Sequence, residues 1–175
     1  MAKNNLSEWS KEELLREIKK LKKRKKYGIV WEDKPEKVAE LCKEKLPILS
    51  MDSSKEIGTD SKQPVNILIE GDNYHALSVL NYTHKGKIDV IYIDPPYNRG
   101  NEGFKYNDKI VDDEDPYRHS KWLSFIGKRL TLAKFVLKRN GLMFISVDEN
   151  EFAQLKLLCD EVFGEKHFVA CVTWR

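Results

Sequence analysis

Four short and almost uninterrupted apolar runs stand out in the later two thirds of the chain. They read VNILIE, IDVIYI, LMFISV and FVACVTW, at residues 65–70, 88–93, 142–147 and 168–174. Strands that are buried on both faces have this composition, and such strands belong to parallel sheets. The pattern therefore predicts four strands of one mainly parallel sheet.

Helical patterns separate these runs. Apolar residues recur at helical spacing in three gaps: Ala76, Leu77 and Leu80; then Trp122, Phe125, Ile126, Ala133 and Val136; then Phe152, Leu155, Leu158 and Val162. Asn140-Gly141 is the expected C-terminal stop of the second helix. Strands that alternate with helices predict an α/β fold with right-handed crossovers.

The N-terminal part has a different residue pattern, with more polar and charged positions. Ser10 and Glu13 have the spacing of a capping box, with Trp9 placed to pack on Leu14, so a helix is predicted from Lys11 to about Lys26. Its basic end, KKLKKRKK at 19–26, is either a phosphate contact or a solvated helix face. The polar stretch at 50–64 is typical of a linker or surface loop. We therefore expect a helical extension and linker at 1–63 and an α/β domain at 64–175.

The tetrapeptide DPPY, residues 94–97, directly follows the second apolar run and precedes a long stretch without a regular pattern, 98–116. In an open α/β sheet, ligands bind beyond the carboxyl ends of the strands, which places Asp94 at the site by topology. Pro95 holds Asp94 in extended geometry, Pro96 does the same for Pro95, and neither proline carries an N–H. The sequence predicts a rigid shelf of acceptors made by the Asp94 carboxylate and the Pro95 carbonyl.

Such a shelf suits the exocyclic amino group of adenine or cytosine. This amine is a poor nucleophile, and two acceptors on its hydrogens favour the form that attacks, so catalysis needs preorganised acceptors more than a strong base. Tyr97 would stack on a base that has left the duplex, worth roughly 1–3 kcal/mol, and Asn98 would hold the loop or a cofactor. The alternative is that the prolines only end a strand and Tyr97 covers the core edge; the position after a buried strand favours the site.

Composition adds a few limits. The net charge of +3 permits an anionic partner without requiring one. Cys42, Cys159 and Cys171 are widely spaced among apolar neighbours, which indicates reduced packing thiols and a reducing compartment. No run approaches the roughly 18 uncharged residues of a membrane span, and the first residues contain no apolar signal core. We expect a soluble, cytoplasmic protein.

At this point the sequence resembles a known family. DPPYN after DVIYI resembles motif IV of the amino-group DNA methyltransferases that use S-adenosylmethionine. In order, ILIEGDNYHALSVL, SKWLSFIGKRLTLAKFVL, NGLMFISVDENE and LKLLCDEVFGE are similar to the modification subunits of type III restriction-modification systems, from about Lys26 onward. The resemblance implies a Rossmann-like sheet with helices on both faces, adenine-N6 methylation of double-stranded DNA, and a permuted order in which the catalytic half precedes the target recognition region and the glycine motif for the cofactor.

Carried over by position, the resemblance implies that Asp94 and the Pro95 carbonyl hold the target amine on the shelf that Pro96 stiffens, and that Tyr97 stacks on the flipped adenine. Asp72, Asp94 and Asn98 would face the cofactor. Asp72 has an equal alternative as the N-cap of the helix that follows, and Asp148 is likewise a cap or a ligand. A restriction subunit and self-association are the implied partners.

Two departures from the family matter. The family has Asn-Thr-Gly-Asn after the tyrosine, whereas this chain has Asn98-Arg99-Gly100-Asn101, so Arg99 either contacts a phosphate or hinders the site. No Gly-x-Gly follows a strand, and no target-reading segment is found. We therefore expect the N-terminal part of a longer protein, which does not methylate alone.

Other functions remain open at this stage. A cytosine-N4 methyltransferase would use the same shelf. A fragment without catalysis would bind DNA or a subunit through the basic helix and the loop DDEDPYRHSK at 112–121. A metal-dependent nuclease would use the acids at 112–115, although four acids in a row are more typical of a solvated patch. The histidines His75, His84, His119 and His167 form no metal-ligand pattern, so no metal is expected.

Overall fold

The computed structural model describes residues 9–23, 31–57, 65–100 and 104–173. The chain forms two compact units, Met1–Trp31 and Glu32–Arg175. In the first unit, helix α1 spans Lys11–Lys23. The backbone N–H of Ser10 donates to Glu13 Oε2 at 2.8 Å, and that of Glu13 donates to Ser10 Oγ at 3.2 Å, so the predicted capping box is confirmed. The basic run beyond Lys23 lies outside the described residues.

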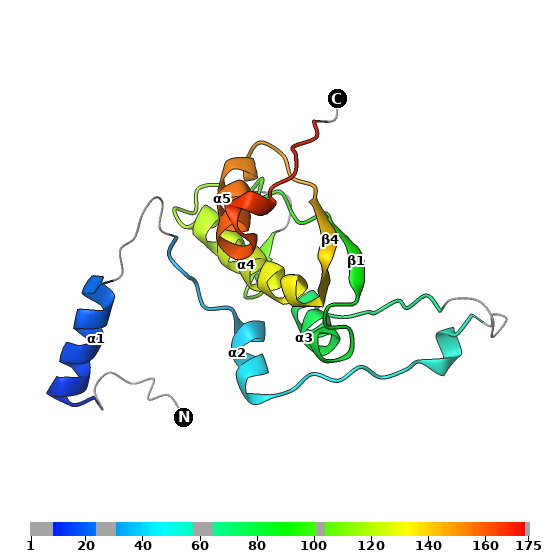
Figure 1. The fold of residues 1–175 in the computed structure, drawn as a ribbon, viewed down its shortest axis with the longest axis horizontal. Helices are drawn as coiled ribbons and strands as arrows, with labels where there is room; N and C mark the ends of the chain where they lie inside the picture. The colour runs from blue at the N-terminus through cyan, green and yellow to red at the C-terminus, as the bar shows by residue number, and fades with distance from the viewer. Residues whose placement is uncertain (1–8, 24–30, 58–64, 101–103, 174–175) are drawn as a thin grey trace. The chain divides into compact units, whose positions relative to one another are not determined.

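The second unit is an α/β structure built on a parallel pair of strands. Its elements are α2 (Lys37–Glu44), the 3₁₀ turn η2 (Ser53–Lys55), α3 (Asn73–Thr83), β1 (Ile88–Ile93), β2 (Lys105–Tyr106), β3 (Lys109–Ile110), α4 (Arg118–Val136), β4 (Leu137–Ile145), α5 (Phe152–Phe163) and η3 (Glu165–His167). Strands β1 and β4 pair in parallel, with Ile93 opposite Ile145. Figure 1 shows α4 and α5 on one side of this sheet. The prediction of an α/β fold with a parallel sheet is confirmed.

The core of this unit lies around α4. The buried apolar side chains of α4 and α5 are Trp122, Leu123, Ile126, Leu130, Ala133 and Val136, with Leu155 and Leu158. They recur at three- and four-residue spacing, as expected for one face of a helix. A Cβ atom on Gly127 would lie 3.3 Å from Leu158 Cδ1, so the glycine allows α4 and α5 to pack closely.

The other face of the sheet is open. Val90 and Tyr92 on β1 pair with Leu142 and Phe144 on β4, and these four apolar side chains are between 47% and 66% exposed. Helices on both faces are therefore not found among the described residues. The sheet therefore differs from the prediction in having one open face.

Two of the four predicted strands are wrong. Residues 65–70 and 168–173 lie in no strand, and Leu68 and Val172 are 95% and 87% exposed. Trp174, the last residue of the second run, lies outside the described residues. A buried-strand pattern becomes a strand only when a neighbouring strand supplies hydrogen bonds and its faces are covered. Neither condition holds for these two runs here.

The predicted helix stop at Asn140-Gly141 is also wrong. Helix α4 ends at Val136, and both residues lie inside β4. The pairing shifts between Ile88 opposite Leu137 and Val90 opposite Leu142, so β4 bulges at this point. A Cβ atom on Gly141 would lie 2.8 Å from Leu137 Cγ and 3.0 Å from the Asp89 carbonyl oxygen, which only glycine avoids. Asn140-Gly141 therefore belongs to a strand with a bulge and does not end a helix.

The stretch 98–116, predicted to be irregular, contains a small antiparallel hairpin of β2 and β3. Its turn residues Asn107 and Asp108 have φ values of 52° and 68°, as in the hairpin turns that match strand twist. The Asn107 side chain accepts from the Lys37 N–H at 2.8 Å and donates to the Pro35 carbonyl at 3.0 Å. The hairpin therefore joins the loop to the segment before α2.

Two further expectations concerned the cysteines as packing thiols and the absence of a membrane span. Cys42, Cys159 and Cys171 are free; the first two are half-buried and Cys171 is exposed, so Cys171 is not the packing thiol that was predicted. Burial raises the pKa of the Cys159 thiol to about 11, which disfavours its reactive thiolate. Within the described part of the chain, no helix has the length and apolar character to cross a membrane.

A buried ion pair fixes the segment before α2 to α4. Arg129 lies 2.8 Å and 3.1 Å from the two carboxylate oxygens of Glu36, and both side chains are buried. We expect Glu36→Gln to lower the free energy of unfolding by about 2 kcal/mol in urea denaturation, because a charge-assisted bond in the interior is lost.

Glu40→Gln is the matched control, because Glu40 pairs with Lys43 at 2.7 Å on the exposed face of α2. Its loss should stay below about 1 kcal/mol. Equal losses for the two variants would show that the buried pair does not fix this segment.

Candidate active site

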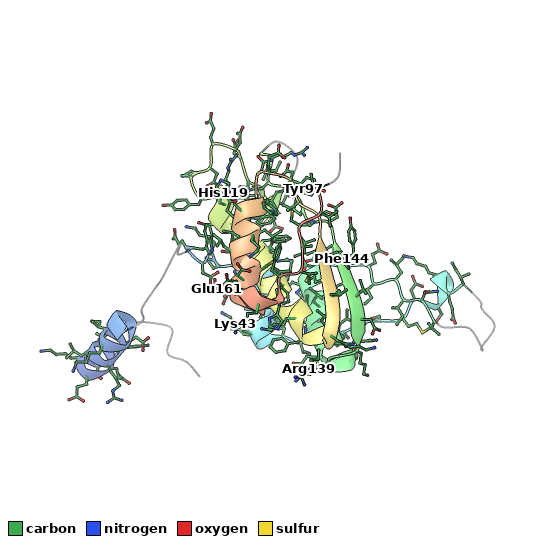
Figure 2. The ribbon with its side chains drawn as sticks, turned by 45° about the horizontal axis from the view of Figure 1, so that its top comes forward. Lys43, Tyr97, His119, Arg139, Phe144 and Glu161 are labelled. Carbon is green, nitrogen blue, oxygen red and sulfur yellow. The ribbon has the colours of Figure 1, made fainter. Side chains whose placement is uncertain are left out.

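Residues Asp94–Arg99 continue beyond the carboxyl end of β1. Together with Phe104 they line a cavity of about 250 Å³. The Asp94 side chain is exposed and Tyr97 is half-buried. Figure 2 shows Tyr97 and His119 at the same end of the unit, opposite Arg139. The structure thus brings the predicted residues Asp94, Pro95, Pro96, Tyr97 and Asn98 together beside a cavity.

The hydrogen-bond acceptors of the shelf differ in whether a described residue donates to them. The Tyr97 hydroxyl donates to Asp94 Oδ1 at 2.8 Å, and this hydrogen bond raises the pKa of Tyr97. The indole N–H of Trp122 donates to the Pro96 carbonyl at 2.6 Å. No described residue donates a hydrogen bond to the Pro95 carbonyl or to Asp94 Oδ2. Two acceptors near the Tyr97 ring therefore have no donor among the described residues.

Asn98 is held from the protein interior. It is 3% exposed, its φ of 58° lies in the left-handed region that asparagine tolerates, and its amide nitrogen donates to Glu151 Oε1. Of the two predicted functions of Asn98, this contact supports the holding of the loop. Contact with a cofactor stays a prediction.

The buried Glu151 and the half-buried His119 form a polar contact that sequence reasoning missed. Glu151 precedes α5 and is fully buried, and His119 Nδ1 lies 2.7 Å from its Oε1. Burial raises the pKa of the Glu151 carboxyl, although Asn98 and His119 act in the opposite direction. The available signal was the position of Glu151 in SVDENE, just beyond the carboxyl end of β4.

Arg99 joins two strand ends. Its Nε donates to Asp148 Oδ2 at 2.6 Å, and its guanidinium carbon lies 5.4 Å from the centre of the Tyr97 ring. Asp148 also accepts from the Asn150 N–H at 3.0 Å. Partial burial raises the pKa of Asp148, but the hydrogen bonds from Arg99 and Asn150 outweigh it and the pKa is lowered overall. Arg99 thus helps to connect the loop after β1 with the loop after β4.

Asp72 is apart from the shelf. Its Oδ1 accepts from the backbone N–H groups of Tyr74 at 2.8 Å and His75 at 3.4 Å, so its alternative as the N-cap of α3 is confirmed. It lines a second cavity, of about 420 Å³, that no shelf residue lines. A contact between Asp72 and a cofactor stays a prediction.

The acidic run at 112–115 is engaged in local structure. Asp112 Oδ1 accepts from the Glu114 N–H at 3.1 Å, and Asp115 Oδ1 accepts from the Tyr117 N–H at 2.8 Å. Asp115 also pairs with the Lys121 ammonium group. Among the described residues, no three metal-binding side chains gather at one place. These contacts shape the entry into α4.

Comparison with known proteins identifies relatives for most of the chain. A family model described as DNA methylase matches residues 88–175. The chain is 36% identical over 151 residues to the Mod subunit of the type III restriction-modification enzyme EcoP15I from Escherichia coli, covering 73% of this chain and 23% of the relative. It is 39% identical over 137 residues to the StyLTI Mod subunit from Salmonella typhimurium, covering 66% and 21%.

A third relative is the type II methyltransferase M.KpnI from Klebsiella pneumoniae, 40% identical over 121 residues that cover 69% of this chain and 29% of the relative. The chain thus spans between 21% and 29% of the length of these three curated relatives. The predicted resemblance to type III modification subunits is confirmed.

Proposed function

This chain belongs to the DNA methylase family, and from that premise we propose that the whole protein methylates the N6 amino group of adenine in double-stranded DNA. The observation that carries the proposal is the rigid shelf after β1, which leaves Asp94 Oδ2 and the Pro95 carbonyl as acceptors beside Tyr97 and a cavity of about 250 Å³. Adenine is favoured over cytosine by the similarity to type III Mod subunits.

In the proposed mechanism the shelf prepares the amine. Asp94 Oδ2 and the Pro95 carbonyl accept its two hydrogens, which turns the nitrogen lone pair out of the ring and makes it available for attack. The amine becomes acidic once it is alkylated, so the Asp94 carboxylate can accept the released proton. Tyr97 stacks on the base that has left the duplex.

S-Adenosylmethionine is the proposed cofactor, and when bound it supplies an electrophilic methyl group. The residues present fit it, because carboxylates suit ammonium and ribose hydroxyl groups, and Asp94 lies at the carboxyl end of β1. Asp94 and Asn98 line the cavity beside the shelf, and Asp72 lines the second cavity with one carboxylate oxygen that no described residue engages. We propose these three residues as its contacts.

The direct test is product analysis. The full-length protein is incubated with double-stranded DNA and radiolabelled S-adenosylmethionine, and the DNA is hydrolysed to nucleosides. We expect N6-methyladenine. N4-methylcytosine would identify the alternative methyltransferase, and DNA binding without any labelled product would favour a binding module without catalysis.

Further features of the whole protein follow from the same proposal. The open apolar face of β1 and β4 supports a larger Rossmann-like sheet with helices on both faces, in which 64–175 form the catalytic half and 1–63 an extension. A restriction subunit and a second copy of the protein are the proposed partners. The proposed location is the cytoplasm. The size of the complexes that the full-length protein forms with itself and with a restriction subunit, measured with and without DNA, tests both partners.

Tyr97 offers a test of base stacking. Tyr97→Ala should weaken binding to DNA with an extrahelical target base by about 5- to 150-fold, since the stacking energy of roughly 1–3 kcal/mol is lost. Tyr97→Phe keeps the ring and loses only the hydroxyl contact with Asp94, so it should bind much as the wild type does. Fluorescence of 2-aminopurine at the target position measures both. Equal losses would assign the effect to the hydroxyl rather than to the ring.

A further inference from the structure

We propose that Glu151 is a positioning residue that acts as a neutral carboxylic acid, paired through both oxygens with the Asn98 side chain, and that this pair fixes the loop carrying the shelf. The effect on methyl transfer rests on the proposed function. The pairing itself does not.

The first observation is the place of the pair. Glu151 is fully buried and Asn98 is 3% exposed. Asn98 directly follows Tyr97, and its left-handed backbone turns the chain toward Arg99. The contact joins the loop after β1 to the start of α5, 53 residues further along the chain. Any shift of Glu151 therefore moves the residue next to Tyr97.

The second observation is the count of hydrogen-bond donors. Asn98 Nδ2 donates to Glu151 Oε1, whereas Asn98 Oδ1 and Glu151 Oε2 are buried and have no partner among the described residues. Both unpartnered atoms are acceptors while the carboxyl group is ionised. One proton on Oε2 turns that oxygen into a donor for Asn98 Oδ1, and the pair then forms the cyclic arrangement of an acid with an amide. A single proton satisfies both atoms, which are otherwise costly to bury.

The third observation is the orientation of the neighbouring side chains on α4. Arg118 Nε donates to His119 Nε2 at 3.3 Å, so Nε2 is the accepting nitrogen of the ring. The proton on His119 Nδ1 is then donated to Glu151 Oε1 at 2.7 Å. Gln154 Nε2 approaches the same Nδ1 only at 3.4 Å, so the ring proton goes to Glu151. Oε1 accepts two N–H groups as a carbonyl oxygen does, and Oε2 carries the acid proton.

The charged and titratable groups that act on Glu151 are His119 and Arg118, both from α4, and both favour the ionised form. Burial opposes them and raises the pKa of Glu151 overall. Between the usual glutamate pKa and the raised one, the folded protein holds a proton that the unfolded chain has lost. The contribution of Glu151 to stability is therefore fully present below the usual value and falls as the pH rises through the raised pKa.

Glu151→Gln separates the two protonation states, because a glutamine amide accepts through Oε1 and donates through Nε2 as the neutral acid does. In the full-length protein we expect Glu151→Gln to transfer methyl groups much as the wild type does, and Glu151→Ala to lose about 100-fold through misplacement of the shelf. Two further readouts do not need activity. The ¹³C carboxyl shift of Glu151 should be that of a protonated acid at neutral pH, and the stability of the wild type relative to Glu151→Gln should fall as the pH rises.

An ionised ¹³C shift at neutral pH, or a Glu151→Gln variant as impaired as Glu151→Ala, would overturn the proposal. If the wild-type protein transfers no methyl group, the proposed function fails. The carboxyl shift and the pH dependence of stability still decide the protonation of Glu151 in that case.

Discussion

Replacing Asp94 with alanine is expected to reduce methyl transfer by the full-length protein by about 10²- to 10³-fold, the loss typical when one preorganised group at a reacting centre is removed. The Asp94 side chain is exposed, and its carboxylate accepts from Tyr97. The free energy of unfolding should therefore change by less than about 0.5 kcal/mol. Filter binding with radiolabelled cofactor measures transfer, and urea denaturation measures stability.

Asp89→Ala is the matched control for this variant. Asp89 lies on β1, the strand that Asp94 follows, is exposed, and pairs with Lys138 at 2.6 Å at the bulge in β4. It should leave methyl transfer unchanged. Asp94→Ala with near-normal turnover would contradict the shelf as the amine-binding site. Unchanged DNA binding in both variants, without transfer by the wild type, would support a binding module.

The elements that were predicted correctly are those whose apolar side chains are buried by other elements of this chain. The buried positions of α4 at Trp122, Ile126 and Val136 were all read from helical spacing, and each is 2% exposed or less. The runs at 65–70 and 168–173 have an equally strong strand pattern, yet a strand also needs a partner, which local sequence does not show. Pattern therefore predicted the helices better than the edges of the sheet.

The shelf was predictable and its support was not. A carboxylate directly after a buried strand lies at the ligand edge by topology, which is sufficient to find Asp94. Nothing in the sequence singled out Glu151, and His119 lay in the predicted loop 112–121 without a metal-ligand pattern. Their importance depends on a contact across 32 residues and on the burial of Glu151, and neither is visible before the chain is folded. Trp122 was found, but only as an apolar position.

Trp122 is expected to show the largest effect on stability. It is fully buried on α4 and donates its indole N–H to the Pro96 carbonyl at 2.6 Å. Trp122→Ala should lower the free energy of unfolding by about 3–5 kcal/mol, because a large side chain is lost from the core and leaves a cavity. Urea denaturation measures this loss. A loss of stability by itself shows only that Trp122 belongs to the core.

Trp122→Phe separates the hydrogen bond from the packing. Phenylalanine retains most of the apolar contact but leaves the Pro96 carbonyl without its indole donor, a loss of roughly 1–3 kcal/mol. Because Pro96 lies between the Pro95 carbonyl and Tyr97, methyl transfer should fall even at temperatures where the variant is fully folded. Leu123→Ala is the matched control, since Leu123 is 2% exposed on the same helix and donates no hydrogen bond to the shelf. If turnover falls in proportion to lost stability in both variants, then Trp122 supports only the core, and the rigidity of the shelf comes from its two prolines alone.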